Sequence, residues 1–280
     1  MYDRTVGESV LTLESIHKNM RFLIQAVVIA TLSMALGCVT PALAQRRGGG
    51  QPGADFGQSQ PSAGLSVRFE GGALCTPIAS PYASPTRYDG SPRKTGGAAG
   101  KHGGIDLSLN EGTPLLAIAP GRVFAVGEGG MMEGIYVWLL HLPQHTGLPF
   151  AFLSKYQHLV EKPRVEPGKL VRLGQTIALS GKTGTVGGHY REAGYPHLHL
   201  TLRAIHEHKL PLVDQANGEF LMGRDTTIID PLTIYIPNLK TPTDGDALAG
   251  DVRQLAVGYV DGSGKVFPAA ARFVWPVACQ

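Results

Sequence analysis

No part of the sequence concentrates positive charge. The 280 residues include 25 Lys and Arg against 22 Asp and Glu, which gives a formal net charge of +3. They form no basic stripe of the kind that nucleic-acid-binding domains carry, so a nucleic-acid partner is not expected. Internal repeats are also missing, as are amphipathic patterns long enough for a helix between about residues 65 and 204. These absences argue against a domain organised around long helices.

Cysteine is scarce as well, with three residues in the chain. Cys38 lies in an apolar leader, whereas Cys75 and Cys279 belong to the part that follows it. An even pair of cysteines in an exported protein can form a disulfide, here one that would tie the two ends of a domain together. The alternative is two unrelated free thiols. We expect the disulfide Cys75–Cys279.

Glycine and proline are abundant, at 37 and 20 residues, which favours short strands joined by turns. Apolar residues make up 43% of the chain, enough for a substantial core. Tightly spaced apolar runs are typical of antiparallel sheet rather than of parallel strands with crossover helices. Such runs alternate with Gly/Pro turns over residues 114–119, 122–127, 134–141, 149–158, 170–172, 175–180 and 197–204. The expected fold is mainly β, a compact antiparallel β-sheet domain.

Residues 1–44 have the pattern of an export signal. Two basic residues precede an apolar run over residues 22–39, and a small-residue cleavage motif ends just before Gln45. Because the stretch before the apolar run is long, Met20 is an alternative start. An uncleaved membrane anchor is the rival interpretation, but the run is short and contains Thr, Ser and Gly. We expect export to the periplasm or the exterior without a remaining membrane span; lipid attachment at Cys38 is the less favoured route.

Residues 45–66 are rich in Gly, Gln, Pro and Ser and contain few apolar residues. Such a composition buries too little apolar surface to offset the entropy lost on ordering. We therefore expect a flexible linker here.

Residues 196–202 alternate between apolar and polar side chains with the period of two that a half-buried strand requires. Three leucines fall on one face, while His197, His199 and Thr201 fall on the other. The two imidazoles would stand about 7 Å apart along the backbone. A histidine face of this kind needs a partner, and a metal ion is the favoured one.

His102 and Asp106 have the same strand parity, yet a straight strand would separate them by about 13 Å. Gly103 and Gly104 lie between them and permit a bend that folds His102 back over Asp106. Catalytic zinc uses three protein ligands, with nitrogen and carboxylate donors suitable. His102, Asp106 and one of the two strand histidines form such a set. Surplus histidines beside a metal, of which His158 is one, can move protons and stabilise an oxyanion.

Taken in order, these motifs resemble the lysostaphin/LytM-type zinc endopeptidases. The resemblance covers roughly residues 76–236. It is carried by H-x-x-x-D at 102–106, Y-x-H-L at 156–159 and H-L-H at 197–199, with flanking similarity at 80–82, 181–184 and 230–232.

The resemblance implies that His102, Asp106 and His199 bind one zinc ion and that His158 and His197 are the catalytic pair. It also implies an antiparallel β domain over residues 67–240 with a groove active site, and hydrolysis of peptide cross-links in bacterial peptidoglycan by a zinc-activated water. The stem or cross-bridge peptides would be the partner.

Two segments depart from the family pattern. Residues 205–227 are predicted to be an insertion, and residues 241–280 a C-terminal extension to which the sequence assigns no role. Either could cover the groove and regulate it.

Two other functions remain open. One is a non-catalytic wall-binding or activator protein, which is disfavoured because all five family residues are present. The other is a zinc carboxypeptidase acting on stem peptides. The remaining histidines are interpreted as surface residues: His206 and His208 in a solvated turn, His189 in a loop, and His141 and His145 exposed beside a proline turn.

Overall fold

The structure is a computed structural model. It describes residues 64–87, 90–93, 100–130, 132–185, 194–206, 212–213, 220–221, 226–242 and 253–280, all within one unit that spans residues 50–280. The predicted export signal at 1–44, the linker up to residue 63, and His189 and His208 lie outside the described residues. Among the helices described, none is long and apolar enough to cross a membrane.

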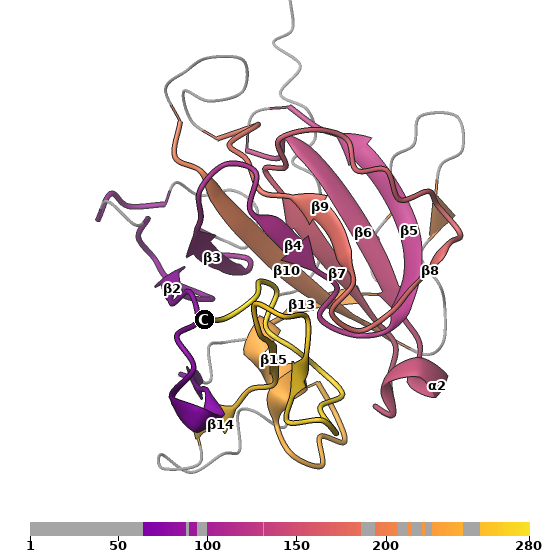
Figure 1. Ribbon diagram of the computed structural model, residues 1–280. Helices are drawn as coiled ribbons and strands as arrows, with labels where there is room; N and C mark the ends of the chain where they lie inside the picture. Colours follow the sequence, from indigo (N-terminus) through magenta and orange to yellow (C-terminus); the bar gives the residue numbers. More distant parts are fainter. Residues whose placement is uncertain are drawn as a thin grey trace, which may run out of the picture. The chain divides into compact units, whose positions relative to one another are not determined.

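The molecule is organised around an eight-stranded sheet in the order β2-β3-β10-β7-β6-β5-β8, with β13 also paired to β10 (Figure 1). All of its pairings are antiparallel, as predicted. The strands are β2 (Ile78–Ser80), β3 (Ile105–Ser108), β5 (Gly121–Glu128), β6 (Ile135–His141), β7 (Phe152–Gln157), β8 (Leu170–Val171), β10 (His197–Ile205) and β13 (Thr226–Ile229).

Short elements surround this sheet, and the described residues contain no helix longer than five residues. The prediction of a mainly β fold is therefore confirmed. Two-stranded pairings join β4 (Pro114–Leu116) to β9 (Thr176–Leu179), β1 (Ser66–Arg68) to β14 (Gln254–Ala256), β11 (Leu212–Val213) to β12 (Phe220–Leu221) and β15 (Tyr259–Val260) to β16 (Val266–Phe267). The helical turns are η1 (Glu70–Gly72), α2 (Pro143–Thr146) and η2 (Pro231–Tyr235).

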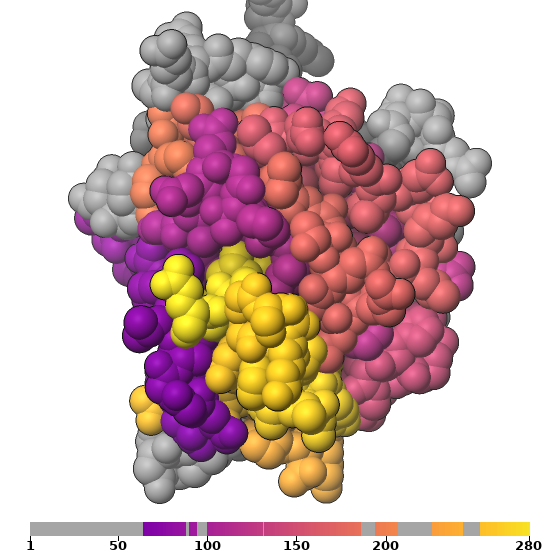
Figure 2. Space-filling model, viewed as in Figure 1, coloured from indigo at the N-terminus to yellow at the C-terminus, as the bar shows by residue number. Residues whose placement is uncertain are grey.

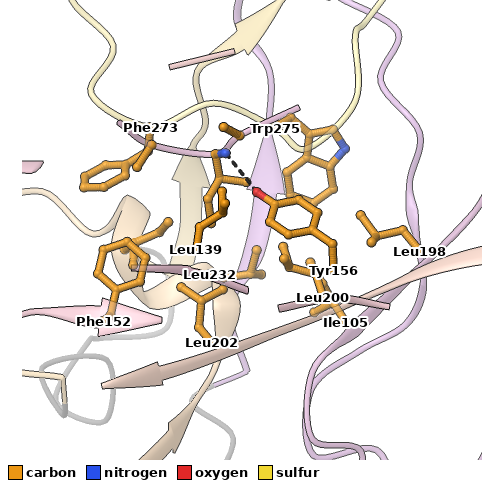
Figure 3. Close-up of a cluster of buried hydrophobic side chains, with 14 of the residues drawn as sticks. Ile105, Leu139, Phe152, Tyr156, Leu198, Leu200, Leu202, Leu232, Phe273 and Trp275 are labelled. Carbon is orange, nitrogen blue, oxygen red and sulfur yellow. Dashed lines mark hydrogen bonds between the residues drawn. The ribbon is translucent and has the colours of Figure 1, made fainter. Parts of the chain in front are cut away.

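The leucine face of β10 forms the centre of the core, as its alternating pattern predicted. Leu198, Leu200 and Leu202 are at most 2% exposed, and Figure 3 shows them in one cluster with Tyr156. Each buried leucine contributes about 1.5–3 kcal/mol relative to an exposed one. The Tyr156 hydroxyl donates to the Leu116 carbonyl at 3.0 Å and accepts from a backbone N–H at 3.0 Å. Because this face is committed to the core, the histidines of β10 must lie on the opposite face.

The C-terminal residues pack into the same core. Trp275 is fully buried, and its indole N–H donates to the Thr76 carbonyl at 3.0 Å. The predicted Cys75–Cys279 disulfide is present. Leu74 and Gln280 exchange two backbone hydrogen bonds, and Figure 2 shows the last residues of the chain (yellow) against the indigo residues that follow residue 63. Residues 253–280 thus belong to the packed unit that holds the sheet.

The prediction that His141 and His145 are exposed is wrong. His141 has no exposed surface: its Nδ1–H donates to the Pro120 carbonyl at 2.9 Å, and its Nε2 lies 2.8 Å from the Ser154 hydroxyl. Its ring stacks on Phe152 at 4.5 Å. His141 is the last residue of β6 and points into the protein, whereas His145 is half-buried in α2. A nearby proline turn in the sequence does not reveal which way these rings face.

Candidate metal centre and the histidines beside it

Pairing between β3 and β10 brings the predicted metal ligands together. Asp106 and His199 are direct partners in the antiparallel register, and Asp106 Oδ1 lies 2.8 Å from His199 Nδ1. His102, in the loop before β3, places its Nε2 3.0 Å from both of these atoms. The three donor atoms all lie within 4.8 Å of one another.

The bend at Gly103–Gly104 allows this approach, as the sequence indicated. A Cβ on Gly104 would collide with the backbone oxygen of Leu200 and would lie 3.1 Å from the His199 ring. The absence of a side chain at Gly104 therefore lets β10 pass close to the bend. His102 then folds back onto Asp106 at 3.0 Å, instead of standing about 13 Å away along a straight strand.

A hydrogen bond on the outer side of His102 fixes its proton on Nδ1, and the one on the outer side of His199 is compatible with a proton on Nε2. The Nδ1–H of His102 donates to the Pro81 carbonyl at 2.9 Å, so the neutral ring presents a lone pair at Nε2. With the His199 proton on Nε2, where the Thr201 hydroxyl accepts it at 3.0 Å, His199 Nδ1 likewise presents a lone pair. Both lone pairs face Asp106 Oδ1.

The buried carboxylate of Asp106 and the two imidazole nitrogens that face it together favour a bound cation. Burial opposes ionisation of Asp106, but a hydrogen bond that His102 or His199 donates to the carboxylate when its facing nitrogen carries a proton outweighs burial and holds the pKa of this carboxyl well below its usual range. Burial also lowers the pKa of His199 to about 4, with Asp106 opposing the shift. At neutral pH His199 therefore carries no extra proton to neutralise the carboxylate. Convergence of electron-pair donors with a buried negative charge fits a metal ion.

His158 and His197, the predicted catalytic pair, lie next to this group. Their ring centroids are 4.5 Å apart, and His197 Nε2 is 3.8 Å from Asp106 Oδ1. The Nδ1–H of His158 donates to the Thr183 carbonyl at 2.7 Å, and that of His197 donates to the Tyr195 carbonyl at 2.8 Å. In the neutral rings, Nε2 of each histidine is left as a proton acceptor.

The backbone of His158 is strained. Its φ of 63° lies in the left-handed region, which costs a non-glycine residue roughly 1–2 kcal/mol. Such strain is common at functional sites, where the surrounding structure holds it in place. Burial, together with the neighbouring His197 and His199, lowers the pKa of His158 to about 3, so the ring is neutral at pH 7.

Some residues of this region carried no signal in the sequence. Lys155 lies opposite Thr201 in the register of β7 and β10. Its ammonium forms an ion pair with Glu133. The same group lies 4.3 and 5.2 Å from the ring centroids of Tyr136 and Trp138. Burial lowers the pKa of Lys155, and Glu133 opposes this shift. The Lys155–Glu133 contact joins residues 22 positions apart and depends on how the strands pair.

His206 takes no part in the metal group. It is exposed, and its Nε2 lies 2.6 Å from the Thr227 hydroxyl. All five predicted site residues, in contrast, lie together on one side of β10.

Comparison with known proteins finds a family match over the segment that contains these residues. Residues 100–211 match the family model for Peptidase family M23. This segment is similar to peptidase M23 domains. The match contains all five predicted site residues, and the predicted resemblance to the lysostaphin/LytM type is confirmed.

Several curated relatives align with part of this chain. An uncharacterized metalloprotease of Haemophilus influenzae is 38% identical over 98 residues, which is 35% of this chain and 18% of the relative. Lysostaphin of Staphylococcus simulans is 34% identical over 113 residues, or 40% and 20% of the two chains. The peptidoglycan DD-endopeptidase ShyC of Vibrio cholerae is 32% identical over 124 residues, which is 44% of this chain and 25% of the relative. The chain thus spans a quarter or less of each of these relatives.

Solved structures superpose on part of this chain at low TM-scores. A zinc-containing peptidase from Vibrio cholerae is 26% identical, with a TM-score of 0.34 over 49% of this chain and 36% of the other. The catalytic domain of lysostaphin from Staphylococcus simulans is 28% identical, with a TM-score of 0.32 over 45% of this chain and 77% of the other.

Proposed function

We propose that this protein is a zinc-dependent endopeptidase that hydrolyses the peptide cross-links of bacterial peptidoglycan. The observation that carries the proposal is the convergence of three donor atoms within 4.8 Å inside the segment that matches the M23 family model. Two curated relatives are named as lysostaphin and a peptidoglycan DD-endopeptidase, which supports peptidoglycan as the substrate class.

His102, Asp106 and His199 would hold the metal. Two imidazole nitrogens and one carboxylate oxygen form a donor set that suits zinc. Zinc bound there supplies polarisation of a carbonyl group and lowers the pKa of water toward neutrality. The outer hydrogen bonds of the two histidines keep the donor nitrogens aimed at the same point.

His158 and His197 would handle protons in this mechanism. Both rings are anchored by bonds from Nδ1–H to backbone carbonyls, so their Nε2 atoms are acceptors with fixed directions. One of them takes a proton from the attacking water. The resulting N–H then donates a hydrogen bond to the oxyanion and returns the proton to the leaving amine. No serine or cysteine nucleophile is needed.

The proposed place of action is outside the cytoplasm, in the periplasm or beyond the cell. The leader-like sequence at 1–44 supports export. The Cys75–Cys279 disulfide also supports it, because such bonds persist in oxidising compartments.

A chromatographic digest of cross-linked peptidoglycan tests the proposal. The purified zinc-loaded protein is compared with His197→Ala, His199→Ala and, as a matched control, His206→Ala, which removes an exposed histidine outside the metal group. We expect the intact protein and the His206 variant to convert cross-linked peptides to uncross-linked ones. His199→Ala should lose both zinc and activity. His197→Ala should keep zinc and lose about 10²- to 10⁴-fold in turnover.

Other outcomes point to other functions. Release of terminal residues with cross-links intact would indicate a carboxypeptidase. Zinc binding without any change in the peptidoglycan would indicate a non-catalytic wall-binding or activator protein. Unchanged zinc content in His199→Ala would contradict the ligand assignment.

A further inference from the structure

Asp106 has a second charged neighbour besides the histidines. Its Oδ1 contacts His102 and His199, whereas its other oxygen, Oδ2, lies 3.7 Å from the guanidinium of Arg93. The side chains of Arg93 and Asp106 are 17% and 9% exposed, so the contact is largely shielded from water. The two oxygens of one carboxylate are therefore turned toward different partners.

The guanidinium of Arg93 is held from two further directions. Its Nη2 donates to the Ser80 hydroxyl at 3.0 Å, and its Nε donates to the Thr86 carbonyl at 3.2 Å. Ser80 is the cross-strand partner of Asp106 between β2 and β3, and its hydroxyl is 3.3 Å from His102 Nδ1. Arg93 thus belongs to a fixed network that touches the outer side of two of the three donor residues.

We propose that Arg93 is a positioning residue for the metal centre, which holds Asp106 so that Oδ1 alone faces the metal. This inference rests on the metal-binding part of the proposed function. A carboxylate can bind a metal through one oxygen or through both, and rotation about its terminal bond changes between the two modes. A guanidinium at Oδ2 opposes that rotation. The open position that a catalytic zinc needs is thereby kept free.

Arginine suits this role better than lysine. Its rigid planar fork can reach Ser80, Thr86 and Asp106 at the same time, whereas a lysine ammonium is a single point charge on a flexible stem. Arg93 precedes the segment 100–211 that matches the M23 family model. The network around the metal centre therefore includes a residue that lies outside the matched segment.

Arg93 carries a positive charge, which by itself would repel a metal ion and weaken its binding. Two variants separate this charge repulsion from the positioning of Asp106. Arg93→Lys keeps the charge and removes the fork, while Arg93→Gln removes both. If Arg93 positions Asp106, both variants bind zinc about 10- to 100-fold more weakly, the range typical for lost partners of metal ligands. If Arg93 acts only through charge repulsion, Arg93→Gln binds zinc more tightly and Arg93→Lys is unchanged, which overturns the proposal.

The experiment measures zinc affinity of the full-length protein by competition with a chelator. Lys101→Gln is the matched control, because it removes the same charge from an exposed residue next to His102. Thermal unfolding of the zinc-free proteins verifies that each variant is folded. Affinities of both Arg93 variants equal to that of the Lys101 variant would overturn the proposal.

The visible absorption spectrum of the cobalt-loaded proteins gives a second readout that a general loss of stability would not change. If Asp106 turns its second oxygen to the metal in Arg93→Lys, coordination number rises and the absorption bands weaken. An unchanged spectrum in that variant would count against the proposal. Failure of the unaltered protein to bind zinc or cobalt would instead refute the proposed function.

Discussion

His199 and Asp106 are direct partners across β10 and β3, with Nδ1 of one 2.8 Å from Oδ1 of the other. The two residues are 93 positions apart in the chain. Their contact depends on the close passage of β10 over Gly104, where no side chain intervenes. Strand pairing thus converts two separate sequence motifs into one candidate metal site.

Replacement of Gly104 by alanine should disrupt this pairing. The new Cβ would collide with the backbone of Leu200, which cannot shift without disturbing the sheet. Overpacking of this kind costs about 1–3 kcal/mol. We expect a loss of that size in the free energy of unfolding, measured with urea, together with weaker zinc binding. Gly262→Ala is the control, because a Cβ there meets no atom within 4 Å. Equal free energies of unfolding and equal zinc affinities in the Gly104 and Gly262 variants would contradict the close packing of β10 against Gly104.

Thr201→Val should weaken metal binding without removing a ligand. Valine has nearly the same shape as threonine but cannot accept the hydrogen bond from His199 Nε2, which is 3.0 Å from the hydroxyl. Loss of such a partner lowers metal affinity about 10- to 100-fold. Thr201→Ser keeps the hydroxyl and should retain most of the affinity. Chelator competition measures both, and equal affinities for valine and serine would refute the role of the hydroxyl.

His141 should make stability depend on pH. Burial lowers the pKa of this histidine from 6.5 to about 4, with the bond to Pro120 opposing the shift. The unfolded chain therefore takes up a proton at a higher pH than the folded one. The stabilisation is complete above pH 6.5 and is lost as the pH falls toward 4, by about 3 kcal/mol in total.

His141→Gln isolates this contribution, because the other buried histidines titrate in both proteins. The variant is expected to be less stable at pH 7, and the difference from the unaltered protein should shrink by about 3 kcal/mol between pH 7 and pH 4. Urea unfolding of the zinc-free proteins at several pH values measures the difference. Parallel pH profiles would show that His141 does not titrate as proposed.

Removal of the Cys75–Cys279 disulfide should destabilise the domain. The bond joins residues 204 positions apart, and closing a loop of that length in the unfolded chain is worth up to roughly 5 kcal/mol. The double variant Cys75→Ala/Cys279→Ala should unfold at lower urea concentration than the unaltered protein. A reductant should lower the stability of the unaltered protein and leave the variant unchanged. Equal stability in all cases would argue against a structural role.

Local periodicity accounts for the parts of the fold that could be predicted. The apolar runs at 122–127, 134–141 and 197–204 correspond to β5, β6 and β10 within one residue at each end. A strand that buries one face must alternate its side chains, so its position and its buried face can be read directly from the sequence. The leucine and histidine faces of β10 follow from this rule.

Other features depend on contacts between distant segments. The burial of His141 and the network of Arg93 with Ser80 and Asp106 leave no local pattern. The packing of Trp275 into the core is of the same kind, since residues 253–280 show no feature that identifies their partners. In each case the contact is set by strand order and register, which short-range patterns do not encode.

By itself the sequence determined where β5, β6, β7 and β10 lie, the two faces of β10, and the histidines and aspartate that could bind a metal. These depend on residue type and spacing within one segment. Only the tertiary structure decided that His102 and Asp106 meet His199 within hydrogen-bond distance, and that Arg93 turns one oxygen of Asp106 away from them. The physical reason is that the charges around Asp106 come from three separate stretches of chain, at 93, 102–106 and 199, and their effects exist only once the sheet has assembled.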